Sequence, residues 1–359
     1  MIFLFNLVSL CYFLIMFKKG VVTVMGMLIG FSLLRAEPEE TQESTSVQLI
    51  FPKEFGKPTL PIDNKLTKER VSLGEKLFHD TILSIDGTVS CAACHVEEFA
   101  FGDDVDLSRG FEGRLGKRNS PPIFNLAWKD HFFWDGRART VREQVLEPIQ
   151  DHLEMAANLN QVLYRLNRRK SYREDFRKAY GPGEITKSTL SLALENYLLT
   201  IVSGDSKFDL SLEKKVKLDP LEDEGRRLFF SSHAKGGAGC FQCHSGPHFS
   251  DFTYRNNGLK PALDLNDLGR YGVTGKEEDK FLFSTPSLRN IAITSPYMHD
   301  GRFENLTEVI NHYDTAAHQT RTLDPLIKKQ GLRLKAEEKK ALIAFLQTLT
   351  DPQFIDDAK

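Results

Sequence analysis

Apolar residues recur along the chain mainly with the spacing of α-helices. In the segment 190–201 they stand three, four, seven and eight positions apart, which places them on one buried face of a helix; they are Leu190, Ala193, Leu194, Tyr197, Leu198 and Ile201. A similar pattern near the C-terminus comprises Leu342, Phe345, Leu346 and Leu349. Thr140-Val-Arg-Glu143 has the form of a capping box that opens a further helix. Because no stretch shows the sustained alternation of a sheet, we predict a mostly α fold with little β structure.

The N-terminal part of the chain has a different composition from the rest. Two apolar runs, 1–17 and 21–34, flank a Lys-Lys pair, and Ala36 precedes polar sequence. A basic pair, an apolar stretch and a small residue have the layout of a secretory signal, so we expect cleavage after Ala36 and a periplasmic protein. Translation from Met16, and retention of the double apolar segment as a membrane anchor, stay open.

The overall charge narrows the classes of partner. Lys and Arg (47) nearly balance Asp and Glu (49), so no field of one sign favours nucleic acid, and we expect no nucleic-acid partner. The 359 residues, of which 41% are hydrophobic, suffice for about two domains once a targeting segment is removed.

Four of the five cysteines stand in two copies of one pattern, Cys91-Ala-Ala-Cys94-His95 and Cys240-Phe-Gln-Cys243-His244. C-x-x-C-H is the attachment signal of c-type haem. The two thiols of each copy can bond the two vinyl groups of one porphyrin, and the adjacent imidazole coordinates the iron. The sequence therefore predicts two covalently bound haem c groups, with His95 and His244 as iron ligands.

Zinc and a redox dithiol are the alternatives for these motifs. A zinc ribbon would hold its two Cys pairs about 15 to 20 residues apart, whereas here they lie in separate halves of the chain. A dithiol would not need a His after each pair. Gly74-Glu-Lys-Leu77-Phe78 and Gly225-Arg-Arg-Leu228-Phe229 precede the two motifs as a weak repeat, which favours two related cytochrome domains.

We therefore expect two cytochrome c-like helical domains, each with one covalent haem, joined near Ser203-Gly-Asp-Ser206. The N-terminal lead-in is acidic and then rich in Pro and Gly, which is typical of a flexible segment. The predicted divisions are a signal peptide or anchor at 1–36, the flexible lead-in at 37–61, an N-terminal haem domain at 62–205 and a C-terminal haem domain at 206–355.

Five further stretches are specific: Leu77-Phe-His-Asp-Thr-Ile-Leu-Ser84, Arg118-Asn-Ser-Pro121, Phe133-Trp-Asp-Gly-Arg137, Ser287-Leu-Arg-Asn290 and Pro296-Tyr-Met-His-Asp-Gly301. With the two haem motifs, they resemble the bacterial di-haem cytochrome c peroxidase family, including its MauG-like branch, over roughly residues 62–352. The resemblance implies that the N-terminal haem reacts with hydrogen peroxide, and that the C-terminal haem receives and relays electrons.

The resemblance also implies roles for single residues. Trp134 matches the tryptophan between the haems, which helps electrons pass; by itself it would be interpreted as a core aromatic. Gln144, Pro148 and Glu154 match residues that line the peroxide pocket. Glu154 would move a proton from the inner to the outer peroxide oxygen when the O–O bond breaks, although a Glu is more often a solvated helix charge.

Asn119, Thr294 and Pro296 match the calcium site that this family holds between its domains. Their side-chain and main-chain oxygens suit a hard cation. Without the resemblance these residues would be interpreted as turn formers, so the expectation of one calcium ion rests on the resemblance.

Two positions depart from the family pattern. Where other members carry a distal His above the N-terminal haem iron, the alignment places Phe111, which cannot ligate iron, so we expect that face to be open. Where they carry an axial Met for the C-terminal haem, this chain has Tyr313, as MauG-like members do. A phenolate ligand would lower the potential of that haem. The alternatives are a buried core tyrosine, with Met298 or His312 as the ligand.

The leading interpretation is a peroxidase that reduces hydrogen peroxide to water with electrons from a small cytochrome c or cupredoxin. The alternative is a MauG-like enzyme that uses peroxide to oxidise residues of a partner protein, and Tyr313 favours it. A pure electron carrier would need no open iron face, so Phe111 argues against that class. The sequence leaves a homodimer open.

The mass of the exported protein tests the haem prediction. Both motifs should carry a porphyrin through two thioether bonds each, so the mass should exceed that of the processed polypeptide by two haem groups. Mass spectrometry under denaturing conditions separates covalent from loosely bound haem. Zinc in place of that added mass would contradict the prediction.

Overall fold

The computed structural model describes residues 45–262 and 265–355. The predicted signal peptide or anchor at 1–36, and the first part of the predicted lead-in, lie outside the described residues. Within the described residues, no helix is long and apolar enough to cross a membrane. The later part of the lead-in packs against the protein: the Val47 N–H donates to the Leu66 carbonyl oxygen (3.0 Å), and the Phe55 side chain is buried.

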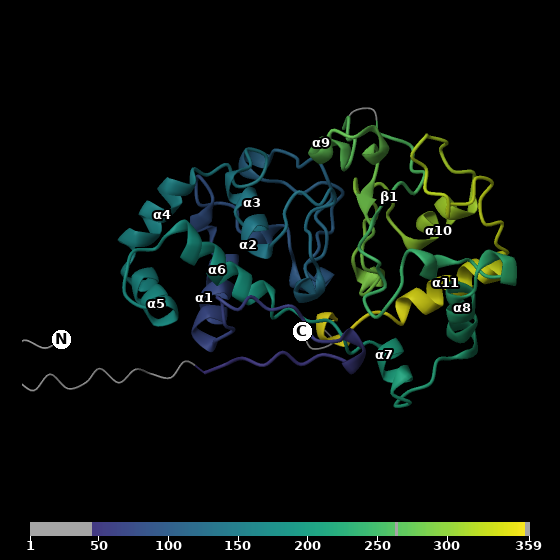
Figure 1. Cartoon of the computed structure of the whole chain (residues 1–359), viewed down its shortest axis with the longest axis horizontal. Helices are drawn as coiled ribbons and strands as arrows, with labels where there is room; N and C mark the ends of the chain where they lie inside the picture. The colour runs from purple at the N-terminus through teal and green to yellow at the C-terminus, as the bar shows by residue number, and fades with distance from the viewer. Residues whose placement is uncertain (1–44, 263–264, 356–359) are drawn as a thin grey trace, which may run out of the picture. The chain divides into compact units, whose positions relative to one another are not determined.

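Helices joined by long loops dominate the secondary structure (Figure 1). The first half contains α1 (Lys68–His79), α2 (Val141–Gln144), α3 (Glu147–Gln150), α4 (Leu159–Arg168), α5 (Lys170–Tyr180) and α6 (Lys187–Leu198). The second half contains α7 (Lys207–Leu212), α8 (Pro220–Phe230), α9 (Tyr271–Thr274), α10 (Leu306–Asp314) and α11 (Ala336–Gln347). The described residues form one small antiparallel sheet, of β1 (Tyr254–Arg255) and β2 (Phe283–Ser284). The mostly α prediction is confirmed.

Short 3₁₀ helices fill many of the loops, and two of them begin at the first cysteine of a C-x-x-C-H motif. In the described part of the chain they are η1 (Lys53–Phe55), η2 (Thr81–Leu83), η3 (Cys91–Ala93), η4 (Glu97–Phe99), η5 (Phe111–Gly113), η6 (Leu126–Trp128), η7 (His233–Lys235), η8 (Cys240–Gln242), η9 (Glu277–Asp279), η10 (Ile291–Ile293) and η11 (Pro352–Phe354).

The helices predicted from apolar spacing are present but shorter than the patterns. Ile201 and Leu349 follow the ends of α6 and α11 and remain buried. The Thr140 hydroxyl accepts from the Glu143 N–H (3.2 Å), as a cap should. The Glu143 carboxylate, however, accepts from the Arg139 N–H (2.8 Å) instead of closing the box on Thr140.

Each half has its own hydrophobic core. The first core is built from residues between Leu66 and Ile201 with Phe354, and the second from residues between Phe208 and Leu349. In the first core α1 packs against α6, and in the second α8 packs against α11. Two cores are what two domains would need, but the predicted domain limits stay a prediction.

The weak repeat seen in the sequence has a packing reason. Gly74 lies where α1 meets α6, and a methyl group there would stand 2.1 Å from the Ala193 carbonyl oxygen. Gly225 lies where α8 meets α11, and a methyl group there would stand 1.9 Å from the Ala341 carbonyl oxygen. Both α1 and α8 also contact the 3₁₀ turn of their own motif. The glycine in each copy therefore permits the close helix pair that supports each motif.

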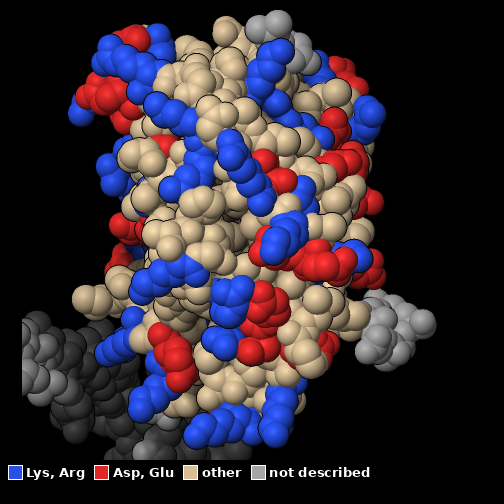
Figure 2. Space-filling view, turned by 90° about the vertical axis from the view of Figure 1, so that its right-hand side faces the viewer, with Lys and Arg blue, Asp and Glu red and all other residues tan. Residues whose placement is uncertain are grey.

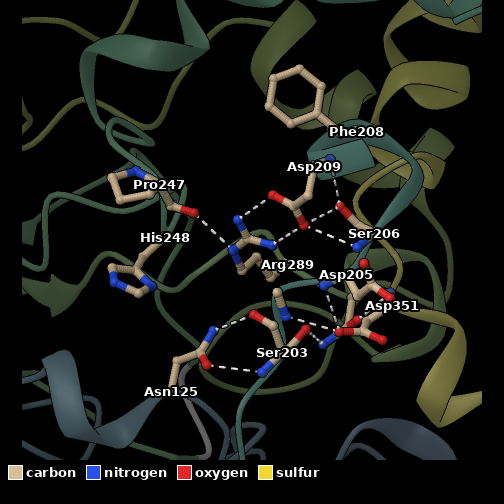
Figure 3. Close-up of polar contacts among 12 residues, drawn as sticks. Asn125, Ser203, Asp205, Ser206, Phe208, Asp209, Pro247, His248, Arg289 and Asp351 are labelled. Carbon is tan, nitrogen blue, oxygen red and sulfur yellow. Dashed lines mark hydrogen bonds and ion pairs between the residues drawn. The ribbon is translucent and has the colours of Figure 1, made fainter. Parts of the chain in front are cut away.

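Buried hydrogen bonds join the two halves around Ser203 (Figure 3). The Asn125 side chain donates to the Ser203 carbonyl oxygen (2.8 Å) and accepts from its N–H (2.9 Å). From the second half, Asn290 Nδ2 donates to the Ser203 hydroxyl (2.9 Å). The Asp351 carboxylate accepts from the N–H groups of the two residues that follow Ser203 (2.8 and 3.0 Å). Because Ser203 is fully buried, these bonds hold the connection in one conformation.

A buried ion pair fixes the start of the second half beside this junction. The Arg289 guanidinium donates to both carboxylate oxygens of Asp209 (2.8 Å each), and its Nε donates to the Pro247 carbonyl oxygen (2.7 Å) (Figure 3). Arg289 is 1% exposed. A guanidinium that is buried to this extent is tolerated because each of its three nitrogen atoms donates a hydrogen bond.

Substitution of Gly225 tests the close helix approach. Gly225→Ala should lower the free energy of unfolding by about 2 to 3 kcal/mol, because the new methyl group must push α8 away from the Ala341 carbonyl oxygen. Denaturant unfolding of the haem-loaded protein measures the change. Gly272→Ala is the matched control, since nothing lies within 4 Å of a methyl group there; equal effects of the two substitutions would contradict the packing argument.

Candidate haem sites

The first C-x-x-C-H motif begins in the 3₁₀ turn η3. The His95 N–H donates to the Cys91 carbonyl oxygen (3.1 Å), and His95 Nδ1 donates to the Phe101 carbonyl oxygen (2.9 Å). Burial lowers the pKa of His95, so its imidazole is neutral and keeps a lone pair on Nε2. A neutral imidazole held at Nδ1 by a carbonyl is oriented to bind a metal through Nε2.

The second motif repeats this geometry. The His244 N–H donates to the Cys240 carbonyl oxygen (2.9 Å). Nδ1 of His244 faces the carbonyl oxygens of Phe249 (3.1 Å) and Pro286 (3.2 Å), to which it donates, and burial lowers its pKa. The acceptors Phe101 and Phe249 both have a left-handed backbone, with φ of 60° and 50°, which is uncommon for a bulky residue. The same strained position behind each motif aims a carbonyl at the imidazole.

The cysteines of both motifs form no disulfide bond within the described part of the chain. Burial raises the pKa of Cys91 and Cys240 to about 12, and that of Cys94 and Cys243 to about 11. Zinc needs thiolates, which this burial disfavours. The described residues also contain no group of three or more His, Cys, Asp or Glu placed to hold a metal ion. Uncharged thioethers to a porphyrin suit buried sulfur atoms, so the donor set fits haem.

A cavity of about 240 Å³ lies against the second motif, and Cys240, Cys243 and His244 form part of its wall. The segment 283–299 supplies much of the rest of the wall, and α8, α10 and α11 contribute apolar side chains to it, which include Phe229, Leu306, Ile310, Leu342 and Leu346. An apolar cavity with an imidazole and two sulfur atoms in its wall fits a porphyrin bound through C-x-x-C-H.

Two of the three candidate sixth ligands line this cavity. Tyr313 and Met298 form part of its wall, whereas His312 Nε2 donates to the Asn257 carbonyl oxygen (3.2 Å). Burial raises the pKa of Tyr313 to about 12, so the phenol stays protonated unless a cation stabilises the phenolate. The Asn257 side chain, which the sequence analysis missed, hydrogen-bonds to both candidates: Nδ2 donates to the Met298 sulfur (3.4 Å), and a bond to Tyr313 opposes the rise in its pKa.

Trp134 lies where the two halves meet. Its ring lines the cavity of the second motif, and its indole N–H donates to the Asn119 carbonyl oxygen in the first half (2.9 Å). Its own carbonyl oxygen accepts from the Ser284 N–H in β2 (2.7 Å). An aromatic ring held by hydrogen bonds to both halves has the position that an electron relay would need.

His299, to which the sequence analysis gave no role, lies in the same wall. Its ring stacks on Phe283 with the centroids 3.6 Å apart, and its carbonyl oxygen accepts from the Asn119 N–H (2.9 Å). Burial lowers the pKa of His299 to about 4, so the ring is neutral. The one signal for it in the sequence was its place in the stretch Pro296–Gly301.

The Glu154 carboxylate lies near the first motif. Its charge contributes to raising the pKa of both Cys91 and Cys94. Burial, assisted by the charge of Asp151, raises the pKa of Glu154 itself to about 7. Glu154 is half-buried rather than fully solvated, and its role in a peroxide pocket stays a prediction.

The loop that carries Phe111 is held against Glu154. The Phe111 N–H donates to the Glu154 carbonyl oxygen (2.6 Å). Gly110 permits this contact, because a methyl group there would stand 2.0 Å from the Leu153 carbonyl oxygen. The structure thus brings Phe111 and Glu154 together, as the sequence analysis requires of two residues above one haem.

The other predicted pocket residues, Gln144 and Pro148, belong to α2 and α3. Gln144 ends α2 and is half-buried, and the Pro148 carbonyl oxygen accepts from the Met155 N–H (3.1 Å), next to Glu154. Arg137 was missed as a site residue. It pairs with Glu147 in α3 (Nε to Oε2, 2.7 Å), and its positive charge opposes the rise in the pKa of Glu154.

The structure also gathers the three residues expected to bind calcium. Asn119, Thr294 and Pro296 all line the cavity of the second motif. The Asn119 amide nitrogen donates to the carbonyl oxygens of Val105 (3.1 Å) and Asp106 (3.3 Å), so its Oδ1 can serve another partner. Oxygen atoms from both halves therefore lie close together here.

Comparison with known proteins bears on these sites. The family model of the di-haem cytochrome c peroxidases matches residues 68–217. The chain is 36% identical over 293 residues to the methylamine utilization protein MauG of Methylorubrum extorquens, and the match covers 80% of each chain. It is 34% identical over 288 residues to the cytochrome c551 peroxidase of Nitrosomonas europaea, which covers 79% of this chain and 81% of that relative.

A solved structure is similar over most of the described chain. It is the crystal structure of a MauG-like protein associated with microbial copper homeostasis, with a TM-score of 0.79 and 31% identity. The superposition covers 87% of this chain and 98% of that protein.

Spectra of a Tyr313→Phe variant test the ligand assignment. If the Tyr313 oxygen binds the second iron, the low-spin signal of that haem in the oxidised protein should be lost or shifted, because phenylalanine offers no donor atom. Optical and electron paramagnetic resonance spectra measure it. Tyr297→Phe is the control, since Tyr297 lines the same cavity but donates its hydroxyl to the Ile291 carbonyl oxygen (2.7 Å). An unchanged signal in Tyr313→Phe rules the phenolate out.

Proposed function

Because the chain belongs to the di-haem cytochrome c peroxidase family, we propose that it reduces hydrogen peroxide to water in the periplasm, with electrons from a small cytochrome c or cupredoxin. One hydrogen peroxide, two protons and two electrons give two water molecules, so each turnover consumes two one-electron donors. The observation that carries the proposal is the half-buried carboxylate of Glu154 beside the first of two motifs that each present a neutral imidazole.

The two motifs would hold the haem groups through thioethers and imidazoles. Bound there, the haem irons supply redox chemistry that the side chains of this protein lack. The chain itself supplies position. The loops behind the motifs orient the imidazoles through the Phe101 and Phe249 carbonyl oxygens, and apolar side chains form much of the wall of the second site.

Glu154 would move the proton that cleavage of the O–O bond requires. As a carboxylate it accepts the proton of the inner peroxide oxygen, and as an acid it delivers that proton to the outer oxygen, which leaves as water. A pKa of about 7 allows both forms near neutral pH. Gln144 and Pro148 would line the pocket around the peroxide, and Arg137 limits how far the pKa of Glu154 rises.

Phe111 and Trp134 complete this proposal. A phenyl ring at position 111 cannot coordinate iron, so the face above the first haem would be open to peroxide without prior reduction of the protein. Trp134 would conduct electrons from the second site to the first, which its hydrogen bonds to Asn119 and Ser284 support.

A second candidate function is favoured by Tyr313. A phenolate ligand would stabilise high oxidation states of the second haem, which suits an enzyme that withdraws electrons from residues of a partner protein. The similarity to MauG of Methylorubrum extorquens supports this candidate, while the similarity to cytochrome c551 peroxidase supports the first.

The proposal also includes a calcium site and a division of the chain into two domains. Asn119, Thr294 and Pro296 would hold one calcium ion between the haem domains, with carbonyl and side-chain oxygens as ligands. The N-terminal domain would extend over 62–205 and the C-terminal domain over 206–355, in keeping with the two hydrophobic cores.

Glu154→Gln tests the catalytic assignment. Peroxide turnover with a reduced small cytochrome should fall by about 10²-fold, because the amide cannot accept the proton. In the native protein the rate should decline as the pH falls through about 7, where Glu154 becomes protonated, and the variant should lose this step in the pH profile. Glu184→Gln, on an exposed loop, is the control for the change of charge.

The same measurements separate the two candidate functions. Turnover of peroxide with a reduced cytochrome supports the peroxidase. Absence of that turnover, together with peroxide-driven oxidation of a protein encoded beside this one, supports the MauG-like enzyme. Full activity of Glu154→Gln in both assays would remove Glu154 from the mechanism.

A further inference from the structure

The cavity of the second motif opens to solvent between two segments, 231–246 and 325–335. Its wall includes His233, Gln242, Leu326 and Lys328, all of which are exposed. Leu326 is 39% exposed. A group bound through Cys240, Cys243 and His244 would therefore present an edge to solvent at this opening, rather than lie fully enclosed.

The two segments beside this opening carry charge of one sign. They contain five Lys and Arg residues and no Asp or Glu, although the whole chain has a net charge of −2. We call these five residues the basic rim: Lys235, Lys328, Lys329, Arg333 and Lys335. All five are exposed. In the space-filling view of this side of the molecule, blue side chains border areas of uncharged surface (Figure 2).

The nearest acidic residues along the chain have other partners. Asp324 pairs with Arg255 (2.6 Å), and Glu337 pairs with Lys340 (3.2 Å). Glu338 accepts from the main-chain N–H of Lys335 (2.7 Å), which leaves it close to one end of the basic rim. Elsewhere on this half, exposed cations are commonly paired with acids, as Arg226 with Asp223 is. The positive field of the rim is therefore largely uncompensated.

Unpaired lysines repel one another and therefore do not stabilise the fold. Stability thus gives no reason for the charges of the basic rim. Apolar surface and exposed positive charge at one opening are the features of a transient protein interface, in which rim charges steer a partner of opposite sign and an apolar centre makes contact. Electron transfer favours this place, because an approaching redox centre comes nearest to the second haem site where its cavity opens.

We propose that the basic rim is the docking surface for the electron donor, and that this donor is a small one-electron redox protein with an acidic surface around its own redox centre. The inference rests on the proposed function, which requires such a donor. Each docked donor transfers one electron to the protein and is thereby oxidised. Two such encounters supply the two electrons that one peroxide consumes.

Binding and electron transfer test the docking surface with the haem-loaded protein. The probes are two single-haem cytochromes c, one acidic and one basic. Calorimetry of the oxidised proteins should show binding of the acidic probe that weakens with added salt, and little binding of the basic probe. In Lys235→Glu/Lys329→Glu, which changes one exposed lysine on each side of the opening and none in the cavity wall, the affinity for the acidic probe, and the rate at which its reduced form delivers electrons, should both fall about tenfold or more.

The control variant makes the same change of charge at a distance. Lys178→Glu/Lys187→Glu alters two exposed lysines of the first half and should bind the acidic probe as the native protein does. Equal binding of both probes, insensitivity to salt, or an equal loss in the control variant would overturn the docking surface. Binding of the rim to anionic phospholipid vesicles, with none to the acidic probe, would also overturn it.

A small neutral reductant keeps this test separate from the proposed function. Peroxide turnover with such a reductant does not need docking, so it should be unchanged in Lys235→Glu/Lys329→Glu. Loss of that turnover in the native protein itself would refute the peroxidase, whereas normal turnover with unaltered binding of the acidic probe in the rim variant would refute the docking surface alone.

Discussion

The chemistry of this protein depends first on how two imidazoles are held. His95 and His244 each donate from Nδ1 to a main-chain carbonyl oxygen a few residues downstream, and burial keeps both rings neutral. The carbonyl oxygens belong to Phe101 and Phe249, whose left-handed backbones point them back at the motif. This bond fixes the tautomer of each imidazole and leaves Nε2 free, which is what a haem iron bound at the motif would need.

The two sites are then joined by groups that have no freedom to move. Ser203 is buried between Asn125 and Asn290, and Trp134 is hydrogen-bonded to both halves. The electron relay that we propose for Trp134 would need a constant distance, and a satisfied buried network would provide one. On the surface, none of the five residues of the basic rim forms an ion pair among the residues that the structure describes, which is why we propose that this opening receives a partner.

The residues that sequence analysis overlooked are those whose interactions involve side chains from other segments of the chain. Asn257 contacts Met298 and Tyr313 from a different segment, and nothing in its own surroundings along the chain marks it. Arg137 and His299 stood in stretches that resemble the family, but their roles appear only when the charge of Glu154 and the ring of Phe283 are seen beside them. By contrast, Glu154 was predicted through resemblance, and only the structure shows that burial raises its pKa.

The sequence by itself determined the two attachment motifs, because thioether bonding and iron ligation need only five consecutive residues. It also determined the helical character, since apolar spacing along 190–201 reports one buried face directly. Only the tertiary structure decided that Gly74 and Gly225 lie at helix contacts, that the half-buried Glu154 carboxylate lies near the first motif, and that Tyr313 lines the cavity of the second. Burial, close approach and pKa are properties of neighbours distant in the chain, so no local pattern can encode them.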